Sequence, residues 1–372
     1  MPNAQPPREP HQLRSYIAPA APATRAPCAG SEPEMRVEFG FTPRWFRASC
    51  GIDFSERWHL DPLYRGETVA AMREELNRRF PSLRLGGDPA APCVNLDGVH
   101  GALTMALIFG IPAQYFRDNW PAARLDPWSR EQVAALKVPD LPNVPVIAQL
   151  MEQMDSIEQR AGRIEGYINW QGVLNSAYRL RGQEIFVDLL QDAGLAHHLF
   201  EVLARTMIAG MRLIYERQRR TGVVVRHATV SNCLVNMVSP AAYREHLFPY
   251  DKMIADAFED FGVHNCAWNA NAYIYDYARF PNLGYVDMGL ESDLALAKRL
   301  CPRARRAIMY KPTDLAVKPL DAIRADLLRV RRQYSPCDIV MADIDLGTPG
   351  ERVEAFARIA QETLRVPPDE AN

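Results

Sequence analysis

The chain has 372 residues, of which 48% are hydrophobic and 24% are charged. Its 43 Lys and Arg against 45 Asp and Glu give a net charge of −2, so it lacks the basic excess and the Lys/Arg runs of a nucleic-acid-binding protein. Its apolar stretches are far shorter than the roughly 20 residues that a membrane-spanning helix needs. These features favour a soluble globular enzyme or small-molecule-binding protein, with no nucleic-acid or membrane partner.

The cysteines and the N-terminal residues indicate the cellular compartment of the protein. The seven cysteines are widely spaced and form no CxxC pair, and the first residues contain no apolar segment typical of a secretory signal. Both observations predict a reducing, cytoplasmic environment. Residues 1–35 are rich in Pro and Ala with a few Arg, which predicts a flexible, disordered N-terminal arm.

From residue 36 onward, short β-branched apolar runs alternate with longer segments of helical spacing. The predicted strands are Val37–Phe41, Cys93–Leu96, Ile164–Ile168, Val223–His227, Gly262–Ala267, Tyr285–Met288, Ala307–Tyr310 and Ile339–Ala342. The predicted helices include Glu184–Gln218, Pro240–Phe261, Ser292–Leu300, Leu320–Arg332 and Gly350–Leu364. Regular alternation is typical of parallel βαβ units. We therefore predict an α/β fold in which residues 36–372 form a single (β/α)8 TIM barrel.

In such a barrel, functional side chains follow the strands at the C-terminal rim. His264 and Cys266 are two residues apart on a predicted strand, so their side chains share one face, and imidazole with thiolate is a zinc-type ligand set. Cys233 follows the preceding strand. The alternative interpretation is a buried cysteine beside a core histidine, with Cys233 a small core residue.

Further polar side chains follow other predicted strands. Asp287 ends one of them, Asp343 follows the last, and Tyr167 and Asn169 follow the third. These four are the predicted catalytic residues. For Asp343 the alternative is charge at a helix N-terminus.

The segment after the first predicted strand is dense in aromatic residues, Arg and His. It includes Arg44, Trp45 and Arg47, which suit an anionic or aromatic substrate, and aromatic packing within a loop is the alternative. The sequence contains neither GxGxxG nor a P-loop motif, so it gives no support to a dinucleotide or nucleoside triphosphate site.

Three segments carry a family resemblance. The stretch GVLNSAYRLRG at 172–182, the stretch SPAAYREHLFPY at 239–250 and the Gly-Thr-Pro at 347–349 resemble, in order, motifs of the uroporphyrinogen decarboxylase superfamily. The resemblance covers roughly residues 90 to 366. It implies a (β/α)8 barrel with its cleft at the C-terminal rim, in a superfamily where homodimers are common.

The superfamily contains decarboxylases of the haem pathway and methyltransferases that pass a methyl group between a corrinoid protein and a thiol. The decarboxylases carry an Arg-rich N-terminal loop, an FSDI aspartate and a late histidine, whereas this chain has no FSDI-like stretch and Ala342 at the late position. The methyltransferases bind zinc through a His-x-Cys and a distant Cys. His264-Asn265-Cys266 resembles the first part, but the distant position also falls at Ala342.

The resemblance therefore implies a zinc-assisted methyltransferase, with the corrinoid supplied by a partner protein. Cys233, Asp343 or Glu291 would complete the zinc ligands, because Cys337 lies near the start of its strand. Zinc would hold a substrate thiol as a thiolate nucleophile. Asn265 and Trp268, beside the ligands, would contact the substrate.

Two other interpretations stay open. In a decarboxylase or lyase acting on a smaller acid, Arg44, Arg47 and Arg181 would bind carboxylates and Asp287 would stabilise a developing cation. In a non-catalytic binding barrel, Ala342 would mark the loss of an ancestral ligand.

Overall fold

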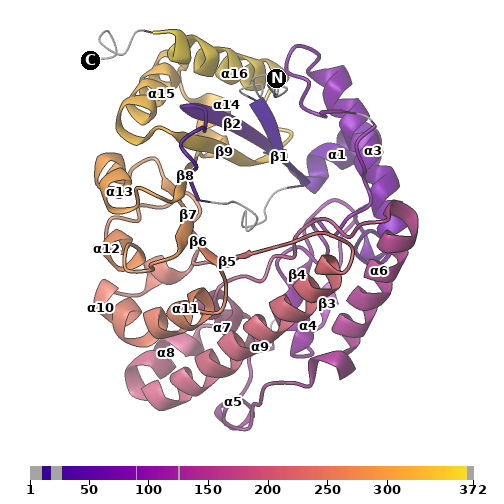
Figure 1. The fold of residues 1–372 in the computed structure, drawn as a ribbon, viewed down its shortest axis with the longest axis vertical. Helices are drawn as coiled ribbons and strands as arrows, with labels where there is room; N and C mark the ends of the chain where they lie inside the picture. The colour runs from indigo at the N-terminus through magenta and orange to yellow at the C-terminus, as the bar shows by residue number, and fades with distance from the viewer. Residues whose placement is uncertain (1–10, 18–26, 89, 125, 367–372) are drawn as a thin grey trace.

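The computed structural model describes residues 11–17, 27–88, 90–124 and 126–366. A parallel seven-stranded sheet in the order β1-β2-β9-β8-β7-β6-β5 forms its centre, and helices surround the sheet (Figure 1). Its strands are β1 (His11–Ile17), β2 (Met35–Phe41), β5 (His227–Ser231), β6 (Asp260–His264), β7 (Leu283–Gly289), β8 (Arg305–Met309) and β9 (Cys337–Ile344). A separate antiparallel pair consists of β3 (Ala113–Gln114) and β4 (Ala122–Ala123).

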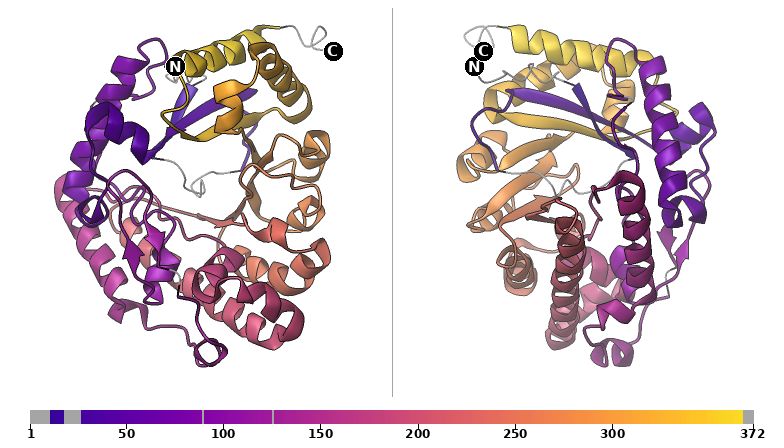
Figure 2. Two further views of the ribbon diagram at one scale, coloured as in Figure 1. Left: turned by 180° about the vertical axis from the view of Figure 1, so that it is seen from behind. Right: turned by 45° about the vertical axis from the view of Figure 1, so that its right-hand side comes forward.

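The helices alternate with the strands in the C-terminal half and form a larger group between β2 and β5. The first group is α1 (Pro43–Cys50), α2 (Glu56–Leu60), α3 (Pro62–Arg79), α4 (Thr104–Ile108), α5 (Arg130–Ala134), η1 (Leu141–Asn143), α6 (Pro145–Ala161), α7 (Val173–Arg181), α8 (Glu184–Gln191) and α9 (Ala193–Arg219). The second is η2 (Val235–Met237), α10 (Pro240–Ala242), η3 (Tyr243–Leu247), α11 (Phe248–Ala255), α12 (Ile274–Tyr277), α13 (Leu294–Leu300), α14 (Pro312–Val317), α15 (Leu320–Tyr334) and α16 (Gly350–Arg365). Helices α15 and α16 pack on each other beside β9, as both views of Figure 2 show.

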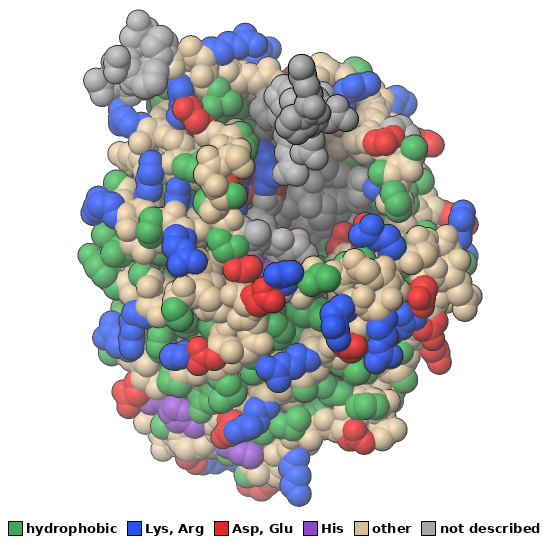
Figure 3. Space-filling model, in the orientation of Figure 1, with side chains coloured by type: hydrophobic (Ala, Val, Ile, Leu, Met, Phe, Trp, Pro, Cys, Tyr) green, Lys and Arg blue, Asp and Glu red, His purple; other side chains and the backbone are tan. Residues whose placement is uncertain are grey.

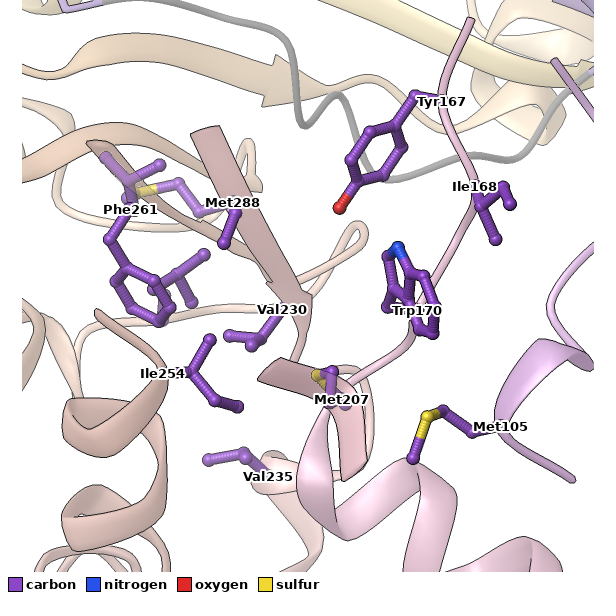
Figure 4. Packing of buried hydrophobic residues seen from close by; sticks show 14 of the residues in the cluster. Met105, Tyr167, Ile168, Trp170, Met207, Val230, Val235, Ile254, Phe261 and Met288 are labelled. Atoms are coloured by element: carbon purple, nitrogen blue, oxygen red, sulfur yellow. The ribbon is translucent and has the colours of Figure 1, made fainter. Parts of the chain in front are cut away.

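The central strands are buried on both faces, as expected of parallel strands covered by helices. Figure 4 shows the core beside β5, where Trp170 lies close to Met207 of α9 and Met105 of α4. Gly210 of α9 makes room for this indole, because a Cβ at that position would lie 2.6 Å from the Trp170 ring. Close packing of this kind fixes the chain just before α7.

A buried charge cluster ties three strands together near their N-terminal ends. The carboxylate of Asp338 on β9 accepts hydrogen bonds from Arg36 of β2 and from Arg305 of β8, each at 3.0 Å through Nε. Paired, hydrogen-bonded charges are the form in which ionised groups are tolerated in a protein interior. This cluster lies at the end of the sheet opposite to the polar residues that follow β5 and β6.

The parallel α/β architecture agrees with the prediction, but two predicted strands are not strands. The segments at 93–96 and 164–168 lie side by side, with the Leu96 N–H donating to the Glu165 carbonyl at 3.0 Å, but Asn95 and Leu96 form a bend and Gly166 has a φ of +96°. Side chains take the place of a regular ladder: Asp97 accepts from the Tyr167 N–H at 2.9 Å, and Gln218 donates to the Ile164 carbonyl at 3.1 Å. Within the described residues, the hydrogen-bonded strands therefore form a seven-stranded sheet whose edge strands are β1 and β5.

Two further expectations differ from the structure. Part of the predicted N-terminal arm, His11–Ile17, forms β1 beside β2, while residues 1–10 and 18–26 lie outside the described residues. The predicted helix Glu184–Gln218 is two helices, because Asp192 has a non-helical φ of −149° and its side chain accepts from the Leu195 N–H at the start of α9.

The surface and the helices agree with the composition. Basic and acidic side chains are interspersed over the face seen in Figure 3, as the near-zero net charge leads us to expect. Among the described helices, none combines the length and the apolar content that crossing a membrane requires.

Candidate metal centre

Three side chains predicted as metal ligands meet beyond the C-terminal ends of β5 and β6. The strands pair in parallel with Ser231 opposite His264, and both strands end at this pair. Cys233 and Cys266 each lie two residues further on, so the shared register brings them opposite one another. Their sulfur atoms are 2.7 Å apart.

The three ligand atoms form a compact donor set. Nε2 of His264 lies 3.2 Å from Sγ of Cys266, and the two sulfurs and an imidazole nitrogen all lie within 4.8 Å of one another. The imidazole is buried and both cysteines are half-buried. Two thiolates and one imidazole form a set that zinc prefers, and three protein ligands leave a fourth position for a substrate, as in catalytic zinc sites. The residues present therefore fit a zinc ion.

The backbone at Cys266 explains how its sulfur reaches this position. β6 ends at His264, so Cys266 is not part of the strand, and its φ of +55° lies in the left-handed region. A non-glycine residue in this conformation costs on the order of 1–3 kcal/mol and is enriched at functional sites. The predicted common face on a strand is therefore replaced by a turn that directs the thiol back toward His264.

Asp287 fixes the orientation of His264. Its fully buried carboxylate lies 2.6 Å from Nδ1 of the imidazole and also accepts from the Tyr285 hydroxyl at 2.8 Å and from the Asn265 N–H at 2.7 Å. A carboxylate on the outer nitrogen of a ligand histidine sets its tautomer and increases its basicity. Asp287, predicted to be catalytic, thus lies behind His264, on the side of the imidazole away from the two cysteines.

The electrostatics of the group favour thiolate. Burial lowers the pKa of His264, but the Asp287 carboxylate and the Cys233 sulfur outweigh burial and raise this pKa to about 10. The hydrogen bond from Cys266 lowers the pKa of Cys233 well below its ordinary value, although burial raises it, and His264 lowers it further. A metal ion would replace the imidazolium proton as the positive charge that stabilises the sulfurs.

A buried hydrogen-bond network supports the turn that holds Cys233. The Asn232 N–H donates to the His264 carbonyl at 2.7 Å, and the Asn232 amide donates to Asp251 of α11 at 2.8 Å. Tyr243 of η3 donates to the same oxygen of Asp251 at 2.9 Å. The turn is thus anchored both to β6 and to the helix that follows it.

The predicted residue Asn169 belongs to a second chain of hydrogen bonds that reaches this turn. Its Oδ1 accepts from the Gln171 amide at 3.1 Å, Gln171 accepts from Asn175 at 3.2 Å, and Asn175 accepts from the Leu234 N–H at 3.1 Å. Tyr167, by contrast, is buried in the hydrophobic core with its ring 6.4 Å from that of Tyr215. Asn169 is thus connected to the Cys233 turn, whereas Tyr167 packs in the core.

Two further predicted site residues flank the ligands. Asn265 is fully buried and donates to the Asp287 carbonyl at 2.8 Å while accepting from the Tyr277 hydroxyl at 2.8 Å, so it supports the centre. Trp268 is half-buried and packs edge-on against Tyr273 at 5.5 Å. Trp268 is thus the more exposed of the two.

The remaining predicted residues gather beyond β2 and β9. Arg44 and Asp343 line a hollow of about 190 Å³ together with Thr42, Asp118, Asn119, Trp120 and Asp345. Arg44 is exposed and lies 3.6 Å from Asp345, and Arg47 lies 4.0 Å from Asp53. Trp45 is only 3% exposed and its ring lies 4.5 Å from that of Phe41, so it packs in the core.

The other residues that could have supplied a third ligand lie elsewhere in the structure. Ala342 is buried in β9, and Cys337 is fully buried at the start of that strand. Glu291 is paired with Lys311 at 2.5 Å. Only Cys233 joins His264 and Cys266 in a group of potential ligands within the described ranges.

Comparison with known proteins gives a likeness in structure. No protein-family model matches the sequence, and no curated protein matches it. Among solved structures, the chain is similar to a methyltransferase from Methanosarcina mazei, with a TM-score of 0.60 and 16% sequence identity over 91% of this chain and 94% of that one. The described structure is therefore similar in fold to that methyltransferase, and it contains a Cys233-His264-Cys266 group that could bind a metal.

Proposed function

We propose that the protein is a zinc-dependent methyltransferase that transfers a methyl group to a small thiol. The convergence of Cys233, His264 and Cys266 within 4.8 Å at the ends of two adjacent strands carries this proposal. The structural likeness to a methyltransferase supports it. We also assign the chain to the uroporphyrinogen decarboxylase superfamily, with the segments at 93–96 and 164–168 in place of two barrel strands.

In this proposal the two cysteines and Nε2 of His264 would hold the ion, while Asp287 would keep the proton on Nδ1. When bound, zinc supplies a positive centre that favours a substrate thiol in its thiolate form. The sulfur of the acceptor forms the new bond to the methyl carbon, the bond between methyl and donor breaks, and the thiol proton leaves to solvent. The donor is a methylated corrinoid carried by a partner protein, as the family resemblance implies.

The position of Cys233 removes the difficulty raised by Ala342. The third ligand comes from the turn after β5 and not from the last strand, so the alanine in β9 is compatible with a complete set of three ligands. Of the arginines that a lyase would use on carboxylates, Arg181 is buried and paired with Asp188 at 2.8 Å, while Arg44 and Arg47 lie near carboxylates at 3.6 and 4.0 Å. The geometry thus favours methyl transfer over decarboxylation.

The experiment that tests the proposal is metal analysis of the purified full-length protein by mass spectrometry. We expect about one zinc per chain, lost in Cys233→Ala, His264→Ala and Cys266→Ala and retained in Cys93→Ala, a half-buried cysteine outside the group. Zinc-loaded protein should then demethylate methylcobalamin in the presence of a thiol. The change in the absorption spectrum of the cobalamin measures this reaction. Absence of zinc from folded protein, or equal zinc in all four variants, would contradict the proposal.

A further inference from the structure

The sulfur atoms of Cys233 and Cys266 lie closer together than a zinc ion would hold them. They are 2.7 Å apart, and neither cysteine is part of a disulfide. Two thiolates on a tetrahedral zinc ion, each about 2.3 Å from the metal, are roughly 3.8 Å apart. The sulfurs of a disulfide are joined at about 2.05 Å. The observed separation thus lies between the two states, and a shift of roughly 1 Å leads to either one.

The backbone geometry also suits a bond between the two cysteines. Each cysteine lies in a turn two residues beyond the paired residues Ser231 and His264, at which β5 and β6 end. Adjacent strands lie about 4.8 Å apart, and the Cα atoms of a disulfide are about 4.4–6.8 Å apart. The left-handed φ of +55° at Cys266 turns its thiol back toward the strand ends. The strand spacing therefore permits the bond without displacement of β5 or β6.

The surroundings of the pair distinguish it from the other cysteines. Both of its thiols are half-buried, so a small oxidant can reach them, whereas Cys301 and Cys337 are buried. The remaining half-buried cysteines donate to backbone carbonyls at 3.2 to 3.4 Å; they are Cys28, Cys50 and Cys93. An oxidised thiol forms a disulfide when a second thiol is at hand, and otherwise it can proceed to sulfinic or sulfonic acid. Cys233 and Cys266 are therefore placed so that their oxidation can be reversed.

Resting on the proposed function, we propose that a Cys233–Cys266 disulfide is a reversible redox modification that empties the zinc site. The two thiolates give up one electron each and form the S–S bond, while hydrogen peroxide takes both electrons and two protons from solvent and leaves as two water molecules. A disulfide carries no negative charge, so only His264 of the three ligands can still bind the ion, which is released. Two molecules of a small thiol reverse the reaction by exchange and become a disulfide themselves. Because the proposed methyl acceptor is a small thiol, an ample supply of it would also keep the site reduced.

The test oxidises the zinc-loaded full-length protein with hydrogen peroxide and follows two products. A chromogenic chelator measures the released zinc, and peptide mass spectrometry identifies which cysteines have been joined. We expect about one zinc released per chain, matched by one Cys233–Cys266 cross-link, and rebinding of zinc after treatment with dithiothreitol. Cys93→Ala should behave as the wild type, because its thiol lies outside the pair. In Cys266→Ser the thiol of Cys233 should instead oxidise to a sulfinic acid that dithiothreitol does not reduce.

The outcomes separate this inference from the proposed function. The zinc content before oxidation tests the proposed function, and the products of oxidation test the switch. Zinc-bearing wild-type protein that yields sulfinic acids without a Cys233–Cys266 cross-link would overturn the switch and leave the zinc centre in place. Cross-linked protein that retains its zinc would overturn the switch as well. Protein that holds no zinc before oxidation would contradict the proposed function and, with it, the release of zinc by a disulfide.

Discussion

The carboxylate of Asp287 on β7 holds Nδ1 of His264 at 2.6 Å, so that Nε2 is the nitrogen directed at Cys266. Removing the negative charge while keeping the shape should therefore weaken metal binding without displacing a ligand. For Asp287→Asn we expect a zinc affinity ~10- to 100-fold lower, since partners of ligand histidines typically contribute this much. Competition with a chromogenic chelator measures it.

The control for this prediction is Asp338→Asn, in which an equally buried carboxylate is lost at the other end of the sheet. That variant should lose stability and keep its zinc affinity when folded. Unchanged zinc affinity in Asp287→Asn would show that the carboxylate does not act on the metal.

Removal of zinc should expose two reactive thiols. The sulfurs of Cys233 and Cys266 are 2.7 Å apart in half-buried positions, and zinc would protect both from a thiol reagent. We expect chelator-treated protein to titrate about two more thiols with a disulfide reagent than the zinc-loaded form. The difference should vanish in Cys233→Ala/Cys266→Ala, whereas a chelator effect that persists there would assign it to other cysteines.

Asp251 should make stability depend on pH. Burial raises its pKa to about 6, although hydrogen bonds from Asn232 and Tyr243 lower it. Between about pH 4 and pH 6 the carboxyl is ionised in the unfolded protein but keeps its proton in the folded one. The contribution of this group to the free energy of unfolding therefore falls as the pH rises. Asp251→Asn, whose amide oxygen can accept both hydrogen bonds, should gain up to about 3 kcal/mol over the wild type across this interval. Urea unfolding of both proteins at several pH values measures it, and a constant difference would contradict the assignment.

His100 should have the opposite pH dependence. Burial, followed by the charge of Arg65, lowers its pKa to about 4, so the folded ring stays neutral where the unfolded one is charged. Its stabilising contribution is complete above about pH 6.5 and should fall by roughly 3 kcal/mol as the pH drops toward 4. His100→Asn removes the titration and suits the left-handed φ of +54° at this residue. The difference in free energy of unfolding between the two proteins should shrink on acidification.

Much of the fold could be predicted because apolar runs identify buried strands directly. The predicted strand Tyr285–Met288 lies within β7, and Ile339–Ala342 lies within β9. The segments at 93–96 and 164–168 have the same apolar character in sequence. Their backbone groups, however, are bonded by the side chains of Asp97 and Gln218, and no local pattern reveals such distant partners.

The candidate site could be predicted in part. Residue types at strand ends pointed to Cys233, His264 and Cys266. The reason that Cys233 joins the other two lies in the register of β5 against β6, which depends on where both strands end. The predicted strand at 223–227 ends four residues before the observed end at Ser231. The sequence therefore does not show that Cys233 and Cys266 lie at the same distance from the ends of their strands.

All three ligands come from a stretch of chain in which Cys233 and Cys266 are only 33 positions apart. A metal held there closes a short loop within one β-α-β unit, from the end of β5 through α10, η3 and α11 to the end of β6. Short loops cost little entropy to close, so this unit can gather its ligands before the distant strands β2 and β9 have paired. Zinc would thus act as a local clamp on the β5–β6 pair, and its loss should loosen these two strands in hydrogen exchange while the β2–β9 pair keeps its protection.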